Sequence, residues 1–266
     1  MTPRFVFIAG LHRTGTSLLA GLLAQHDAIG AIDGAPVPEQ EGCYLQGAIP
    51  HTARHGIPGR FATDPMEHYT EAHALNTMET RDRIRSDWCG WFDQAKPWHL
   101  EKSPVNLTRM RLLQALFPLA KFVVILRHPQ YMAAALRKWS ERDAAALTAY
   151  GVAAYDIMAG DLPYIHSHLV IRYEDLVRRP EQHMAAIHTF LDLPPQRVRH
   201  DCRDGNADYE RPGPGEVGGA VEAMARWGYG AEGVVGIFEP IVADPLRHIA
   251  NDTRAAFISR EKIGGN

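Results

Sequence analysis

A short segment near the N-terminus combines two spaced glycines, three hydroxyl side chains and an arginine, a set suited to binding a phosphate-like anion. Gly10 and Gly15 have the spacing of the glycines in G-x-x-x-x-G-K-[ST], the phosphate-binding loop of nucleotide triphosphatases, and Ser17 occupies the position of the last hydroxyl. Thr16 stands where that motif has its lysine, and the cation of this segment is Arg13. The segment is therefore expected to bind an anion but to be poorly suited to ATP.

The flanking residues are expected to place this segment between a strand and a helix. Phe5–Ala9 is an apolar run typical of a buried strand in a parallel sheet, and Ser17–Gln25 is rich in Leu and Ala and predicted to be helical. The N–H groups of the turn and the helix N-terminus, which carries about half a positive charge, would face the anion. A turn that binds nothing is the alternative. A secretory signal peptide is excluded because His12 and Arg13 interrupt the apolar run.

Composition sets limits on partners. The net charge of −3 gives no reason to expect a nucleic acid or an anionic membrane, and no run approaches the ~18 apolar residues of a membrane span. Cys43, Cys89 and Cys202 lack C-x-x-C spacing and are expected to be thiols of a cytoplasmic protein. His51 and His55 could bind a metal if helical, but nearby prolines and a glycine favour a loop, so no metal is expected.

The length suits one large domain, residues 1–266, built from alternating strands and helices. Strand-like runs are predicted at Phe5–Ala9, Trp98–Leu100, Lys121–Leu126 and Leu169–Arg172. Helical patterns are predicted at Ser17–Gln25, Pro104–Leu116, Gln130–Glu141, Asp143–Met158 and Pro180–Leu191. This alternation predicts an α/β fold, a P-loop-like three-layer α/β/α arrangement with a central, mainly parallel sheet. Residues 33–97 depart from it and are expected to form a helical or loop cap on the acceptor side, and residues 201–219 to form a mobile loop.

A second cation is expected at the end of another strand. The apolar run Phe122–Leu126 is followed by Arg127, whereas a nucleotide triphosphatase needs an acidic residue at a strand end to hold magnesium. Because ligands of such sheets bind at the carboxyl ends of the strands, Arg127 would face the same crevice as the glycine loop. A surface ion pair is its alternative role. Two separate anion sites without an obvious metal ligand indicate a nucleotide with phosphates at both ends.

Four segments resemble, in order, those of sulfotransferases that use 3′-phosphoadenosine 5′-phosphosulfate (PAPS). Residues 10–19 resemble the family's 5′-phosphosulfate loop, and residues 124–129 resemble its 3′-phosphate strand and turn. Residues 98–104 contain Glu-Lys-Ser-Pro, as in carbohydrate and bacterial members, and residues 173–176 are Tyr-Glu-Asp-Leu, a segment whose tyrosine lies near the adenine. These segments cover most of residues 1–195.

The resemblance implies which residues hold the donor. They are His12, Arg13, Thr14, Gly15, Thr16, Ser17, Arg127 and Tyr173. One position departs from the family, which usually has a serine about eight residues after the arginine, where Ala134 and Ala135 stand here. The resemblance then requires the remaining 3′-phosphate contact to come from elsewhere, with Lys138, Arg137 or Arg211 as candidates.

Catalysis of sulfuryl transfer, like that of phosphoryl transfer, rests on positioning and on stabilising charge at the leaving phosphate. Arg13 and Lys102 are the candidates for stabilising that charge. The alternative role of Lys102 is a surface ion pair with Glu101. The acceptor hydroxyl also needs a base. The resemblance places it after the first helix, where Glu41 is the first candidate and Glu39 the second. His12 and His51 are the alternatives.

The predicted function is transfer of a sulfuryl group from PAPS to a hydroxyl of a small-molecule, sugar or lipid acceptor, with adenosine 3′,5′-bisphosphate (PAP) as product. A non-catalytic PAP-binding module and a P-loop phosphotransferase are the alternatives. The aromatic residues of 88–98 could line the acceptor pocket or belong to the core, and residues 61–92 could be an acceptor lid.

Overall fold

The computed structural model describes residues 3–51, 55–217 and 219–258. Their core is a six-stranded sheet with the order β2-β3-β1-β4-β5-β6, in which the first five strands are parallel and the last is antiparallel to its neighbour. The strands are β1 (Arg4–Ala9), β2 (Ile29–Ala31), β3 (Trp98–Lys102), β4 (Lys121–Leu126), β5 (His168–Arg172) and β6 (Ile241–Ala243). The predicted central, mainly parallel sheet is therefore confirmed.

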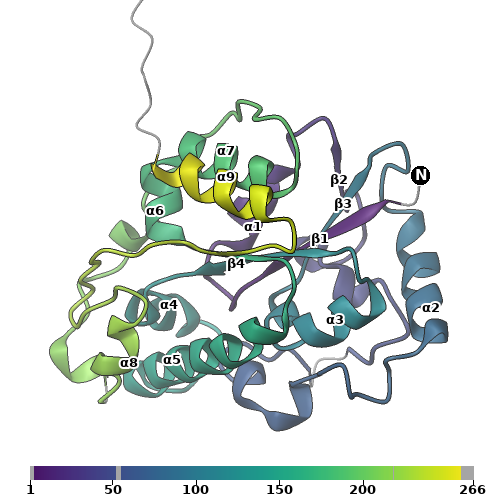
Figure 1. The fold of residues 1–266 in the computed structure, drawn as a ribbon. Helices are drawn as coiled ribbons and strands as arrows, with labels where there is room; N and C mark the ends of the chain where they lie inside the picture. Colours follow the sequence, from purple (N-terminus) through teal and green to yellow (C-terminus); the bar gives the residue numbers. More distant parts are fainter. Residues whose placement is uncertain (1–2, 52–54, 218, 259–266) are drawn as a thin grey trace, which may run out of the picture.

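Helices cover both faces of this sheet (Figure 1). They are α1 (Thr16–Leu23), α2 (Met78–Cys89), α3 (Met110–Leu116), α4 (Pro129–Leu136), α5 (Ala144–Asp161), α6 (Tyr173–Arg178), α7 (Pro180–Phe190), α8 (Val221–Ala225) and α9 (Arg247–Ile258). Alternate side chains of β1 enter opposite cores. Val6 and Ile8 pack with α1, α6, α7 and α9, whereas Phe5 and Phe7 pack with α2 to α5 and α8. The predicted three-layer arrangement is confirmed.

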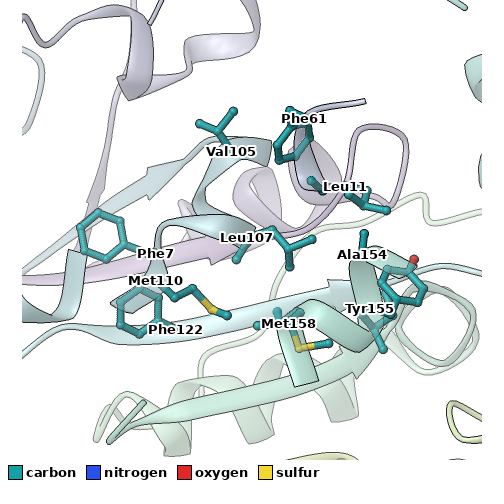
Figure 2. Close-up of a cluster of buried hydrophobic side chains, with 14 of the residues drawn as sticks. Phe7, Leu11, Phe61, Val105, Leu107, Met110, Phe122, Ala154, Tyr155 and Met158 are labelled. Carbon is teal, nitrogen blue, oxygen red and sulfur yellow. The ribbon is translucent and has the colours of Figure 1, made fainter. Parts of the chain in front are cut away.

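The core that contains Phe5 and Phe7 extends to the carboxyl ends of the strands. Figure 2 shows Phe7 and Phe122 of the sheet packed beside Met110, with Met158 and Tyr155 of α5 nearby. Leu11, the first residue of the turn after Gly10, is fully buried in the same cluster, close to Phe61. A rigid apolar base thus holds the loop that follows β1.

Two helix predictions were wrong at their ends. The segment predicted as one helix over Pro104–Leu116 starts as a 3-10 turn and becomes α3 only at Met110, because Arg109 has non-helical backbone angles where it forms a buried ion pair with Glu67. The helix predicted to reach Glu141 ends at Leu136. The next helix starts soon after this point, with the Asp143 carboxylate accepting a hydrogen bond from the Ala146 amide.

The aromatic residues between positions 88 and 98 belong to the cores. Trp88 and Phe92 pack around Phe5, and the indole N–H of Trp88 donates to the Gly42 carbonyl. Trp98 is buried on the opposite face of the sheet. Residues 52–54 of the expected cap and residue 218 of the expected mobile loop lie outside the described residues. Within the described part of the chain, no helix is long and apolar enough to cross a membrane.

Candidate active site

The crevice lies where the carboxyl ends of β1, β3 and β4 meet, as expected for a parallel α/β sheet. It encloses a cavity of about 240 Å³. The residues that line it are His12, Arg13, Gly15, Thr16, Ser17, Leu18, Glu39, Glu41, Pro104, Arg127 and Trp139. The fold therefore brings together three parts of the chain: the loop after β1, the segment of Glu39 and Glu41, and Arg127 after β4. They are up to about 120 positions apart in the sequence.

The loop after β1 has the form of an anion cradle. Gly15 has a φ of 97°, and a Cβ atom there would lie 2.7 Å from the ring of Tyr173, so only glycine fits. The backbone amides that follow start α1 without a side-chain cap. Arg13 also adopts a left-handed conformation, with a φ of 69°, which is a strained geometry typical of functional loops. The amide and hydroxyl of Thr14 both donate to the Leu11 carbonyl, so this residue supports the loop from inside.

Two carboxylates face this loop beside the lysine of β3. The Lys102 ammonium donates to the Glu39 carbonyl at 2.8 Å and to Glu41 Oε1 at 3.3 Å, whereas the Ser17 hydroxyl donates to Glu39 Oε2 at 3.0 Å. Glu39 and Gln40 have positive φ angles of 51° and 54°, which turn the chain sharply at this point. The ion pair of Lys102 is with Glu41, and it is buried.

Glu101 holds the segment that carries Glu41. Its buried carboxylate accepts hydrogen bonds from the Gly42 amide at 3.0 Å, the Ser103 hydroxyl at 2.5 Å and the Asn106 side chain at 2.6 Å. Glu101 therefore links the end of β3 to the segment that carries Glu41 and supports both of them.

Arg127, the residue after β4, lines the crevice beside the glycine loop. Its Nη1 donates to the Arg13 carbonyl at 2.9 Å, and its Cζ lies 4.7 Å from the centre of the Tyr173 ring. Its Nε donates to Asn206 Oδ1 at 2.8 Å. The Arg127 side chain therefore connects the glycine loop to Tyr173 at the start of α6 and to the segment that contains Asn206.

Burial sets the protonation of the groups in this crevice. It raises the pKa of Glu41 to about 7, although the neighbouring Lys102 acts in the opposite direction. Burial and the positive charge of Lys102 lower the pKa of His12 to about 4. At neutral pH, His12 is therefore uncharged, and the carboxylate and carboxylic acid forms of Glu41 are both populated.

A sequence model of the sulfotransferase family matches residues 3–197. This chain belongs to the sulfotransferase family. The match includes the glycine loop, β3 with its lysine, Arg127 and Tyr173, so the crevice described above is the candidate active site of a sulfotransferase. A search of curated proteins found no match.

Several solved structures are similar to this sulfotransferase. A sulfotransferase from Alicyclobacillus acidocaldarius has 18% identity over 84% of this chain and 94% of its own, with a TM-score of 0.49. A sulfotransferase from Mycobacterium tuberculosis H37Rv has 18% identity over 84% of this chain and 76% of its own, with a TM-score of 0.48. The sulfotransferase domain of the Synechococcus PCC 7002 olefin synthase has 16% identity over 97% of this chain and 96% of its own, with a TM-score of 0.45.

Some residues expected at the site lie away from the cavity of this sulfotransferase. Arg211 is 70% exposed and pairs with Glu232 at 3.3 Å. Lys138 lies with its ammonium 5.3 Å from the Trp139 ring and does not line the cavity. His51 packs edge-on against Tyr44, and burial lowers its pKa to about 4. No group of three or more potential metal ligands occurs among the residues that the structure describes.

Two residues of this site were not predicted from the sequence. Trp139 is 51% exposed, lines the cavity and lies 5.2 Å from the Arg13 guanidinium carbon. An aromatic residue within the polar run that follows α4 was the available signal for it. Asn206, which accepts a hydrogen bond from Arg127, had no local signal, because this contact joins residues 79 positions apart in the sequence.

Exchanging Gly42 for alanine tests the role of the Glu101 support. A Cβ atom at this position would lie 2.7 Å from Glu101 Cγ and 2.8 Å from Glu101 Oε1, so the segment that carries Glu41 must shift. We expect sulfotransferase turnover to fall at least tenfold and the midpoint of thermal unfolding to fall by several degrees. Gly21→Ala is the matched control, because a Cβ atom there meets nothing within 4 Å. Unchanged turnover in Gly42→Ala would contradict a positional role for Glu101.

Proposed function

We propose that this sulfotransferase moves a sulfuryl group from PAPS to a hydroxyl of a small-molecule, sugar or lipid acceptor and releases PAP. The observation that supports the donor is a set of buried nitrogen atoms around the cavity. Arg13 Nε, Arg127 Nη2 and His12 Nδ1 have no hydrogen-bond partner among the described residues. Buried polar atoms without partners are costly, and two of these three belong to cations on separate segments that line the crevice, the loop after β1 and the end of β4. A ligand with an anionic group at each end fits them.

The residues of this chain divide between the two ends of such a donor. The amides of residues 15–17, the hydroxyls of Thr16 and Ser17, and Arg13 would hold the 5′-phosphosulfate, with His12 and Thr14 supporting the loop. Arg127 would hold the 3′-phosphate, and the Tyr173 ring would lie beside the adenosine. The proposed contributions of Lys138 and Arg211 would require both side chains to move toward the cavity. No metal has a role in this proposal.

When bound, PAPS supplies an activated sulfuryl group that transfers in line to the acceptor oxygen. The task of the protein is to stabilise the charge that grows on the leaving phosphate, and N–H groups and cations do this in a site that excludes water. Lys102 has three donors, of which two contact Glu39 and Glu41. The third is available to the phosphate. Glu41, or Glu39 in its place, would take the proton of the acceptor hydroxyl.

Ligand-dependent stability tests the donor. At a hundredfold excess over Kd, PAP is expected to raise the midpoint of thermal unfolding by about 5 °C, and ATP with magnesium is expected to have little effect. The lysine position of the nucleotide triphosphatase motif holds Thr16, which is the reason for this difference. Stabilisation by ATP and magnesium alone would instead indicate a phosphotransferase.

Turnover tests the acceptor class. Radiolabelled PAPS and a panel with a phenol, a sugar and a steroid or lipid alcohol should give one labelled, sulfated product class. Binding of PAP without label transfer to any member of a broad hydroxyl panel would indicate a non-catalytic binding module. A cytoplasmic location, inferred from three cysteines without disulfide or metal spacing, belongs to the same proposal.

A further inference from the structure

The buried guanidinium of Arg127 forms hydrogen bonds through two of its three nitrogen atoms. Only 5% of this residue is exposed. Nε donates to Asn206 Oδ1 at 2.8 Å, and Nη1 donates to the Arg13 carbonyl at 2.9 Å. The Nη2 atom is buried and has no partner among the described residues. The planar group therefore has one defined edge left with which to bind an anion.

Asn206 is itself fixed in one orientation. Its Nδ2 donates to Glu174 Oε1 at 3.1 Å, so the amide must present its oxygen to Arg127. Glu174 is buried, and it also accepts hydrogen bonds from the His128 amide at 2.9 Å and from the Tyr229 hydroxyl at 2.9 Å. Arg127, Asn206 and Glu174 thus form a closed polar network that joins the end of β4 to the start of α6.

The segment that carries Asn206 also contacts the expected adenosine side of the crevice. The Gly205 amide donates to the Tyr173 hydroxyl at 2.7 Å, and that hydroxyl donates to the Arg203 carbonyl at 3.2 Å. The ring of Tyr209 lies 5.7 Å from Arg127 Cζ. Residues 203–209 lie beyond the part of the chain, 3–197, that the family model matches.

We propose that Asn206 is a positioning residue that holds Arg127 for the 3′-phosphate of the donor. No hydroxyl side chain stands at Ala134 or Ala135 on α4, so Arg127 carries more of the 3′-phosphate contact and its orientation matters more. This inference rests on the proposed use of PAPS. With Nε and Nη1 engaged, the guanidinium is held in one orientation, and Nη2 is the nitrogen left to donate to the phosphate. The preference for a 3′-phosphorylated nucleotide then depends on residues 203–209 as well as on Arg127 at the end of β4.

The binding of two nucleotides by isothermal titration calorimetry separates this role from general support of the fold. PAP carries the 3′-phosphate, and adenosine 5′-monophosphate (AMP) lacks it but still engages the glycine loop. We expect Asn206→Ala to weaken PAP binding about 10- to 100-fold, as for the loss of one hydrogen bond to a charged group, and to leave AMP binding within twofold. Asn251→Ala, an exposed asparagine on α9, is the matched control.

A double-mutant cycle with Arg127→Ala gives a second readout. If Asn206 acts through the arginine, Asn206→Ala should cost PAP affinity less than about threefold once Arg127 is gone. Additive losses, or equal losses of PAP and AMP affinity, would overturn the positioning role. If the wild-type protein binds PAP no more tightly than AMP, the donor assignment fails, whatever the variants show. Retained AMP binding also verifies that each variant is folded.

Discussion

Replacing Lys102 with methionine is expected to lower kcat by about 100- to 1,000-fold, with a much smaller change in KM for the donor. The side chain is buried and donates to Glu39 and Glu41. In the proposed mechanism its third N–H stabilises the leaving phosphate, whose negative charge grows only as the transition state forms. A loss confined to the transition state reduces kcat rather than binding. Steady-state kinetics with PAPS and the acceptor found in the panel measures the two constants separately.

The same variant should also change the pH dependence of its residual activity. Lys102 lowers the pKa of Glu41, so its removal leaves a buried carboxyl without its cation and moves that pKa above 7. The rise of kcat/KM should therefore shift to higher pH. Lys96→Met, at the opposite end of β3 from the crevice, is the control. A Lys102→Met enzyme with wild-type kcat and an unchanged pH profile would exclude the lysine from catalysis.

Glu41→Gln is the second variant with a large expected effect, a fall in kcat of about 100- to 10,000-fold. Because burial raises the pKa of Glu41 to about 7, the basic form predominates only above that pH. In the wild-type enzyme, kcat/KM should rise about tenfold per pH unit below pH 7 and level off above it. Glutamine cannot accept the proton, so this rise should be absent in the variant.

Glu39→Gln distinguishes the two carboxylates. The Glu39 side chain accepts a hydrogen bond from the Ser17 hydroxyl, and its backbone carbonyl accepts one from Lys102. Its replacement should therefore affect the loop. Because the charge of Glu39 is the smallest of the causes that raise the pKa of Glu41, the pH-dependent rise of kcat/KM should remain and move slightly to lower pH. If both glutamine variants retain near-normal turnover, the base is not a carboxylate of this segment, and His12 becomes the next candidate.

The features that could be predicted from the sequence are local ones. The glycine loop, the strand before it and the arginine after β4 each lie within a few residues, and their side-chain types and spacing follow directly from backbone sterics and anion binding. The long apolar strands β4 and β5 were located for the same reason. The strands β2 and β6 have only three residues each, which is too short to show a period.

Helix α2 was not predicted because its sequence carries many charges and few apolar residues. Thr80, Ile84 and Trp88 are the residues that it buries, one at each turn. Their packing against Phe5 and its neighbours, rather than intrinsic helix preference, accounts for its position. The ends of α3 and α4 were misplaced for a related reason, since a buried ion pair of Arg109 overrides the local helical pattern in one of them.

Residue types and spacing were enough to predict an anion-binding loop without a lysine, an arginine in place of a magnesium ligand, and one lysine and two glutamates as candidates for catalysis. The contacts and the burial of these groups depend on how distant segments pack together. Burial of Glu41 beside Lys102 sets its pKa near neutrality, and no local pattern encodes burial. The partner of Arg127 is likewise a long-range choice, because Asn206 comes from a segment that reaches the arginine only after the chain has crossed β5 and folded back.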